Sequence, residues 1–250
     1  MDFTLIRYNQ LLKTLLAQGF EFQLFSSFLK KPAPRIIILR HDVDRRPGNS
    51  LKTARIEHNL GIQSTFYFRA VPESWDEGII RKIAGLGHEI GYHYENLSVC
   101  KGNPDQAWDD FQANLANLRE LAPVTTICMH GSPMSRINNL DLWQTYEYKT
   151  QDIVGEPYLD VDYGKVFYLT DTGRRWNHAG ASIRDRVDSG FDIQIDSTIH
   201  LMDLAQRGRL PDQIMINTHP QRWEDRALPW VKELVWQNVK NVVKHVWFKT

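Results

Sequence analysis

Cysteine is scarce in this sequence, and no charge of either sign is in excess. Only Cys100 and Cys128 occur among 250 residues, and neither lies in a zinc-knuckle or Cys-x-x-Cys spacing. A disulfide framework is therefore excluded, and both residues are expected to be reduced thiols. Lys plus Arg and Asp plus Glu number 30 each. No global field attracts the chain to nucleic acid or to a membrane surface, and a neutral or locally recognised partner is expected instead.

The sequence also lacks a long apolar run and a pattern that would indicate export. No stretch approaches the roughly 18 apolar residues that a membrane span needs. The N-terminus has no basic segment followed by an apolar stretch and a small-residue cleavage site. We therefore expect a cytoplasmic protein with no membrane span and no nucleic-acid partner. A hydrophobic content of 42%, with no repeat or linker, predicts one domain over residues 1–250. The sequence does not indicate an oligomeric state.

The apolar pattern alternates between strands and helices, which is typical of a parallel α/β fold. Residues 36–39, Ile-Ile-Ile-Leu, form the clearest buried strand. Further strands are expected at residues 65–68, 88–93, 124–129, 166–169 and 214–217. Helices are expected at residues 8–16, 47–60, 79–86, 104–118 and 231–246. Residues 134–165 have the least regular pattern.

Residues that can bind a metal ion or move protons follow or end five of the predicted strands. They are Asp42 and Asp44 after the first strand, and then His93, His130, Asp171 and His219 on four others. The C-terminal ends of parallel strands converge on one face of an α/β barrel, where such enzymes build their sites. A single residue of this kind is as easily a satisfied polar strand end, but the agreement of five strand ends favours a functional site.

Asp42 and Asp44 suggest a metal ion, because a buried carboxylate pair is costly without a cation or hydrogen-bond partners. Carboxylate and imidazole ligands suit zinc and neighbouring divalent ions, and His93 and His130 can supply the nitrogens. His219 is a further candidate for acid–base chemistry.

The motifs resemble those of the polysaccharide deacetylases, the NodB-homology enzymes of the fourth carbohydrate esterase family. Residues 87–93, Gly-His-Glu-Ile-Gly-Tyr-His, resemble the family's second motif, Gly-His-Glu-Ile-Gly-Asn-His. Residues 40–44 take the place of the first motif, and residues 130–133, 171–176 and 218–220 take the places of the later ones. The resemblance runs in motif order from about Arg40 to Trp223, and is to a divergent subgroup associated with bacterial surface-polysaccharide synthesis.

The resemblance implies a distorted (β/α)7 TIM-like barrel that binds a divalent metal, zinc or else cobalt or nickel, through one Asp and two His. It implies removal of an N-acetyl group from an acetylated sugar or sugar nucleotide. Carried over residue by residue, Asp42 is the base, Asp44 and His93 are metal ligands, and His219 is the acid. Asp171 would orient His219.

Two aromatic residues were assigned by the same comparison. Trp176 and Trp223 would form walls against a sugar ring, with packing in the core as the other interpretation.

The sequence departs from the family pattern at three places. Val43 separates Asp42 from Asp44, so the roles of base and ligand could be exchanged. Leu97 stands where the family has its second metal histidine. His130 stands where the family has an arginine, and we assign it as the replacement ligand.

These departures leave alternatives open. Glu95 is the other candidate for the missing ligand, and His130 could instead steady Asp42. Arg40 or Arg69 would otherwise steady that base, and Arg40, Arg69 and Glu95 are also candidates for binding the substrate.

Two other functions remain open at this point. One is a carbohydrate-binding protein that keeps the barrel without turnover, and the other is a metal-dependent hydrolase acting on another amide, such as a cyclic one. The sequence does not identify the sugar, the position deacetylated or the native metal.

Overall fold

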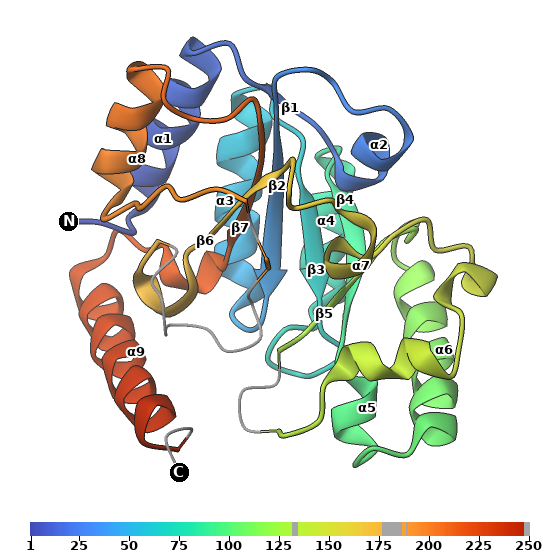
Figure 1. Ribbon diagram of the computed structural model, residues 1–250. Coiled ribbons are helices and arrows are strands. Elements are labelled where there is room, and N and C mark those ends of the chain that lie inside the picture. The colour runs from blue at the N-terminus through green and yellow to red at the C-terminus, as the bar shows by residue number, and fades with distance from the viewer. Residues whose placement is uncertain (132–134, 177–186, 189, 248–250) are drawn as a thin grey trace.

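The computed structural model describes residues 1–131, 135–176, 187–188 and 190–247, with side chains described as far as residue 238. Its centre is a parallel sheet of seven strands in the order β5-β4-β3-β2-β7-β6, with β1 paired to β2 outside this path. The sheet curls, and helices pack around its outside (Figure 1). The α/β class and the distorted barrel predicted from the sequence are confirmed.

The elements follow the expected alternation. The strands are β1 (Glu21–Phe22), β2 (Ile36–Val43), β3 (Thr65–Phe68), β4 (Glu89–Tyr94), β5 (Ile127–Met129), β6 (Phe167–Thr170) and β7 (Gln213–Thr218). The α-helices are α1 (Leu5–Ala17), α2 (Phe25–Lys30), α3 (Pro47–Asn59), α4 (Glu77–Gly85), α5 (Asn96–Val99), α6 (Pro104–Arg119), α7 (Pro157–Asp160), α8 (Thr198–Gln206) and α9 (Ala227–Trp247). The 3₁₀ helices are η1 (Asn139–Gln144), η2 (Tyr148–Gln151), η3 (Thr172–Arg174) and η4 (Pro220–Arg222).

Strand β2 occupies the middle of the sheet. All eight of its residues are buried, and it pairs with β3 on one side and with β7 on the other. The strand is longer than the apolar run predicts, because Arg40, His41 and Asp42 continue the ladder as far as Val43. The polar end of β2 therefore lies between the ends of its two neighbours.

The sheet is a barrel that does not close, since no described ladder joins its edge strands β5 and β6. An isolated bridge between Thr126 and Gly155 extends the β5 edge. Strand β5 is also shorter than predicted: residues 124–126 lie outside it, apart from this bridge at Thr126. The segment with the least regular sequence pattern contains η1, η2 and α7, which cover this edge.

Apolar helix faces form the outer core, as the helical spacing predicts. Helix α1 buries Tyr8, Leu11, Leu12 and Leu15. Helix α6 buries its face against β4, with Phe111 and Leu115 in the same apolar cluster as Tyr92. A separate cluster that includes Phe25, Ile38, Tyr67 and Met215 contributes further core packing.

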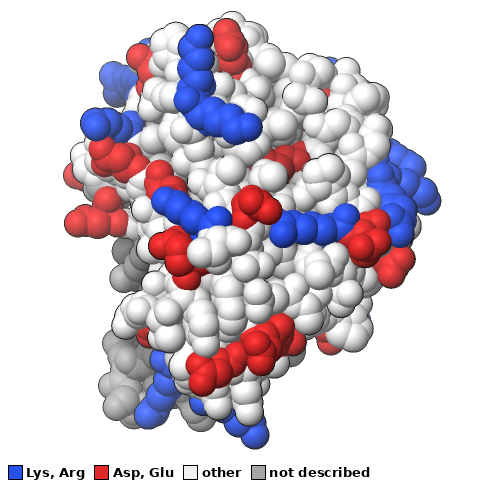
Figure 2. All heavy atoms as spheres, turned by 90° about the vertical axis from the view of Figure 1, so that its right-hand side faces the viewer, with Lys and Arg blue, Asp and Glu red and all other residues white. Residues whose placement is uncertain are grey.

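Helix α9 exposes several apolar side chains and buries an acidic one. Its apolar residues Leu228, Val231, Val235 and Trp236 are exposed, whereas Glu233 is buried. None of the described helices is long and apolar enough to cross a membrane. On the face shown in Figure 2, basic and acidic side chains are interspersed rather than gathered by sign, in keeping with the formal net charge of zero.

Candidate functional site

The C-terminal ends of the central strands face downward in Figure 1, with α5 and α9 on either side of that end. Strand β2 carries Asp42 and is followed by Asp44, while β4 carries His93. His130, Asp171 and His219 directly follow β5, β6 and β7. The predicted convergence of strand ends therefore brings these side chains to one place, and the contacts below describe it.

Asp44, His93 and His130 each place one possible ligand atom within 4.8 Å of the others. Asp44 Oδ1 lies 3.7 Å from His93 Nε2 and 3.5 Å from His130 Nε2. This oxygen is buried and accepts no hydrogen bond of normal length from any described residue. A buried carboxylate oxygen in that state is costly unless a cation satisfies it. One carboxylate and two imidazoles form a donor set that fits zinc.

Both histidines present Nε2 to this space because a neighbour engages Nδ1. His93 Nδ1 lies 2.9 Å from the Cys128 carbonyl oxygen, to which it donates as an N–H. His130 Nδ1 lies 2.7 Å from Glu95 Oε2. Such partners set the tautomer and the ring orientation of metal-binding histidines. The two rings are thus arranged for binding a cation through Nε2.

Glu95 contacts His130 rather than the space between the three ligand atoms. Among the described residues, it belongs to none of the groups that could hold a metal ion. It accepts a 2.8 Å hydrogen bond from Arg69 Nε, and Arg69 Nη1 donates to the Asp44 carbonyl oxygen at 3.2 Å. Burial would raise the pKa of Glu95, but the hydrogen bond from His130 and the charge of Arg69 lower the pKa to about 2. Arg69 therefore steadies Glu95 and the β2–α3 loop, rather than Asp42 as one alternative predicted.

Asp42 is held by Arg40. The guanidinium donates from Nε to Oδ1 at 2.9 Å and from Nη2 to Oδ2 at 2.7 Å, and Asn217 Nδ2 donates to Oδ2 at 3.0 Å. Burial would raise the pKa of Asp42, but the charge and hydrogen bonds of Arg40, together with the neighbouring His93 and His219, hold the pKa well below its usual range. Asp42 is therefore an ionised carboxylate, and within the described part of the chain its Oδ1 accepts one hydrogen bond, from Arg40.

The prediction that Arg40 binds substrate is wrong, since its side chain is buried beneath Asp42 and also donates to the Tyr158 hydroxyl. The alternative that Arg40 steadies the carboxylate describes its contacts. Arg40 and Asp42 alternate along β2, so they share one face of the strand.

His219 is oriented by Asp171. Its Nδ1 lies 2.6 Å from Asp171 Oδ1, and its backbone N–H donates to the same carboxylate. Arg222 Nη1 and Trp223 Nε1 also donate to Asp171, at 2.6 and 2.8 Å. Burial would raise the pKa of Asp171, but Arg222 and then His219 lower it. His219 Nε2 is left 3.9 Å from Asp44 Oδ2, beside the triad.

The two tryptophans do not form walls of an open site. Trp223 and Trp176 are buried, and their ring centroids lie 6.2 Å apart within the core. The indole of Trp223 donates to Asp171, and that of Trp176 donates to Thr198 at 3.0 Å. The sugar-wall prediction is wrong for both, because all of their apolar surface is used in packing.

Leu97, which occupies the place of the family's second metal histidine, packs against Ala107 and Leu142. Its side chain is buried in this small cluster. Position 97 therefore contributes to packing, and the second imidazole of the triad comes from His130 at the end of β5.

Two residues near the carboxylates were not found from the sequence. Asn217 holds Asp42, and Gln221 Nε2 donates to Asp44 Oδ2 at 3.0 Å. Asn217 lies two residues before His219 on β7, so strand alternation could have indicated it. Gln221 lies in η4, and no signal in the sequence distinguishes it from a surface glutamine.

No protein-family model matches this chain, and no curated protein matches its sequence. Solved structures do match. They include CE4 family proteins and a peptidoglycan N-acetylglucosamine deacetylase, in keeping with the family that the motifs resemble. One is the Xyl-CE4 domain of a multidomain xylanase from the hindgut metagenome of Trinervitermes trinervoides, at 13% identity and a TM-score of 0.42 over 84% of each chain.

Two further structures match with similarly low identities and TM-scores. A CE4 family pseudoenzyme from Bacillus anthracis matches at 11% identity and a TM-score of 0.44, over 85% of this chain and 62% of that one. A peptidoglycan N-acetylglucosamine deacetylase, in complex with an N-oxidanyl-benzamide, matches at 17% identity and a TM-score of 0.43 over 82% of each chain. Similarities this low assign neither an activity nor a substrate, which must be inferred from the residues of the site.

Proposed function

We propose that this protein is a metal-dependent hydrolase that removes an N-acetyl group from a sugar or sugar precursor. The proposal is carried by the triad of Asp44, His93 and His130, whose buried carboxylate oxygen is aimed at two imidazole nitrogens. An oriented carboxylate, Asp42, and an oriented imidazole, His219, lie beside this triad.

Asp44, His93 and His130 would hold the divalent cation, with zinc as the first choice and cobalt or nickel as alternatives. When bound, such an ion polarises an amide carbonyl and makes a bound water more acidic.

Asp42 is suited to the role of base. Arg40 keeps the carboxylate ionised and fixes its plane, with Oδ2 3.9 Å from His93 Nε2, so that it can accept a proton from the attacking water. The new bond joins the water oxygen to the acetyl carbon. A carboxylate with a lowered pKa is a weak base, so Asp42 releases this proton to solvent as the products leave.

His219 is suited to the role of acid. Asp171 accepts the hydrogen bond from Nδ1, which orients the ring so that Nε2 is directed at the site, and Nε2 carries a proton when the ring is in its imidazolium form. Nε2–H can donate to the amide nitrogen as the C–N bond breaks, so the products are acetate and a free amine. The buried Asp171 stabilises the imidazolium before that transfer.

The choice of an acetylated sugar rests on the sequence motifs. Residues 87–93 and 218–220 contribute His93 and His219 to the site in the order that the deacetylase motifs imply. On the same basis we propose a role in surface-polysaccharide metabolism in the cytoplasm. A non-catalytic carbohydrate-binding protein would have no need of both an ionised Asp42 and an oriented His219.

The test is acetate release by purified, zinc-loaded protein from N-acetylglucosamine oligosaccharides and from an acetylated sugar nucleotide, compared with ring opening of cyclic amides. Removal of the metal by a chelator should abolish acetate release, and zinc, cobalt or nickel should restore it. Metal binding without acetate release from any sugar would overturn the proposed reaction. Lack of binding to all three metals at micromolar concentration would overturn the proposed metal centre.

A further inference from the structure

A hollow of about 650 Å³ lies between the β2–α3 loop and α9. It is lined by Arg45, Arg46, Lys232, Glu233, Val235 and Trp236. Arg45 and Arg46 directly follow Asp44, and consecutive Cα atoms are only about 3.8 Å apart. Two residues that line the hollow are therefore one and two positions along the chain from the proposed metal ligand Asp44.

The lining is cationic. Arg45, Arg46 and Lys232 face one acid, Glu233, whose side chain is only 1% exposed. Arg45 Nη2 donates to both oxygens of Glu233 at 2.7 and 2.8 Å, and Gln237 donates to it as well. The charge of Glu233 is thus neutralised by Arg45.

The positive charges of Arg46 and Lys232 are exposed to solvent. The Arg46 side chain is 40% exposed and lies 3.6 Å from Glu233, outside hydrogen-bond distance, and Lys232 is exposed. Both residues also line an adjoining hollow of about 380 Å³, in which Arg226 and Glu224 form an ion pair at 2.9 Å and so add no net charge. Because the chain as a whole is neutral, this is a local concentration of positive charge beside the site.

An apolar surface adjoins these cations. Val235 and Trp236 line the same hollow and are 57% and 49% exposed. Arg and Lys side chains bind phosphate oxygens by charge-assisted hydrogen bonds, and an indole offers a broad apolar face. The chemistry that satisfies both is an anionic phosphate group attached to an apolar or aromatic substituent.

We propose that this hollow binds the diphosphate of the substrate, so that the acetylated sugar reaches the metal centre as a sugar diphosphate ester. The ester's other substituent, a nucleoside or an isoprenoid, lies along Trp236. The inference rests on the proposed function, because that function places the sugar at Asp44 and its neighbours.

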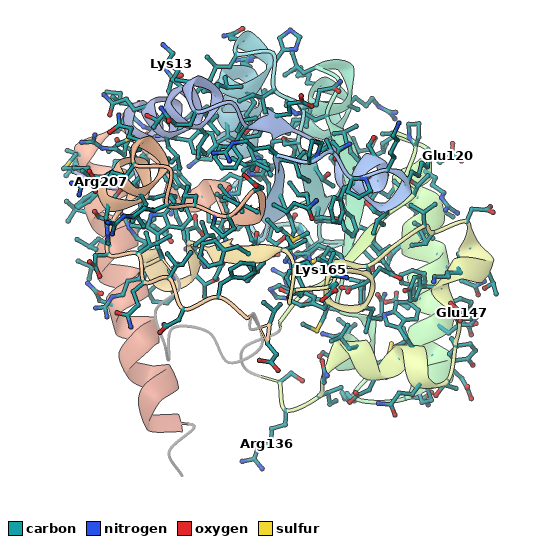
Figure 3. The ribbon with its side chains drawn as sticks, turned by 45° about the horizontal axis from the view of Figure 1, so that its top comes forward. Lys13, Glu120, Arg136, Glu147, Lys165 and Arg207 are labelled. Carbon is teal, nitrogen blue, oxygen red and sulfur yellow. The ribbon has the colours of Figure 1, made fainter. Side chains whose placement is uncertain are left out.

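The test is calorimetric titration of the full-length, zinc-loaded protein with uridine diphosphate and, separately, with farnesyl diphosphate. The site variant is Arg46→Gln/Lys232→Gln. The matched control is Lys13→Gln/Arg207→Gln, which removes two exposed cations on α1 and after α8 (Figure 3). Circular dichroism checks that both variants are folded.

We expect at least one probe to bind the wild type and the control with the same Kd, and to bind the site variant about tenfold or more weakly. Tighter binding of uridine diphosphate would assign a nucleoside substituent, and tighter binding of farnesyl diphosphate an isoprenoid. Equal Kd values for the wild type and the site variant, or no saturable binding of either probe, would overturn the proposal.

A failure of this proposal can be told from a failure of the proposed function. The site variant should keep its zinc and its acetate release from an uncharged N-acetylglucosamine oligosaccharide, because neither uses Arg46 or Lys232. Trp236→Ala should weaken the better probe while leaving the binding of inorganic pyrophosphate unchanged. If Trp236→Ala weakened the better probe and inorganic pyrophosphate equally, the proposed contact between Trp236 and the ester's other substituent would be wrong.

Discussion

His130 Nε2 lies 3.5 Å from Asp44 Oδ1, the buried carboxylate oxygen that accepts no normal hydrogen bond within the described part of the chain. The two residues follow different strands, β5 and β2, and meet because parallel strand ends converge. In the proposed metal centre, His130 would be the third ligand in a chain that has Leu97 at the position of a metal histidine.

His130→Ala should weaken zinc binding by more than about 100-fold, since two ligands would remain. Glu95→Gln should have a smaller effect, about 10- to 100-fold, because Glu95 orients His130 without reaching the ion. Zinc content after dialysis against a competing chelator measures both. Full occupancy in His130→Ala, together with loss in Glu95→Gln, would move the ligand role to Glu95.

Asp42→Asn should lower the rate of acetate release by about 10²- to 10⁴-fold without loss of zinc. It should also lower the free energy of unfolding by about 3 kcal/mol, because the buried Arg40 guanidinium loses its counter-ion. Rates must therefore be measured where circular dichroism shows a folded variant. Asn217→Ala is the control, since it removes one donor to Asp42 and keeps the ion pair. Near-normal turnover by Asp42→Asn would exclude Asp42 as the base.

His219→Ala and Asp171→Asn should both reduce turnover by about 10²- to 10⁴-fold and leave zinc content unchanged. The first removes the proposed proton donor, and the second removes the acceptor that keeps a proton on Nδ1. Acetate release and metal analysis on the same preparations separate the two effects. Loss of zinc in His219→Ala would place His219 among the ligands.

Glu57→Gln tests how much the ionised Glu57 carboxylate, which contacts His41 of β2, stabilises the fold. The Glu57 carboxylate accepts a 2.7 Å hydrogen bond from Tyr8, lies 3.0 Å from His41 Nε2 and is fully buried. Burial would raise the pKa of Glu57, but His41 and its other partners lower the pKa from 4.5 to about 2. A carboxyl with a lowered folded-state pKa adds stability above its unfolded pKa and loses it as pH falls through the folded value.

The expected loss in Glu57→Gln is about 3 kcal/mol at pH 7, shrinking as pH falls from about 4.5 toward 2. Urea unfolding of wild type and variant across this range measures it. Glu120→Gln, at an exposed position labelled in Figure 3, is the control and should change stability little. A difference that stays constant from pH 7 to pH 3 would show that the ionisation of Glu57 contributes nothing.

Leu97→His should not restore the family's ligand set. Leu97 is buried against Ala107 and Leu142, so an imidazole there would replace apolar packing and lack a hydrogen-bond partner. We expect a loss of about 1 to 3 kcal/mol in unfolding free energy and no gain in zinc affinity. Tighter zinc binding by this variant would show that the position still faces the site.

The sequence determined the parts of this protein that depend on local pattern. Apolar runs such as residues 36–39 favour buried strands, and helical spacing at Tyr8, Leu11, Leu12 and Leu15 produces an apolar helix face that packs against the core. Because polar residues follow these strands directly, the parallel topology was enough to predict that Asp44, His93 and His130 would share one face.

Only the tertiary structure decided the partner of each side chain. Arg40 could equally have faced a substrate, and Trp223 could equally have faced a sugar, until Asp42 and Asp171 were seen to accept their hydrogen bonds. The reach of a side chain depends on the curl of the sheet and on residues far away in the chain, and sequence spacing contains neither. Pairing across strands, rather than residue type, therefore separates the side chains that face the site from those that support it.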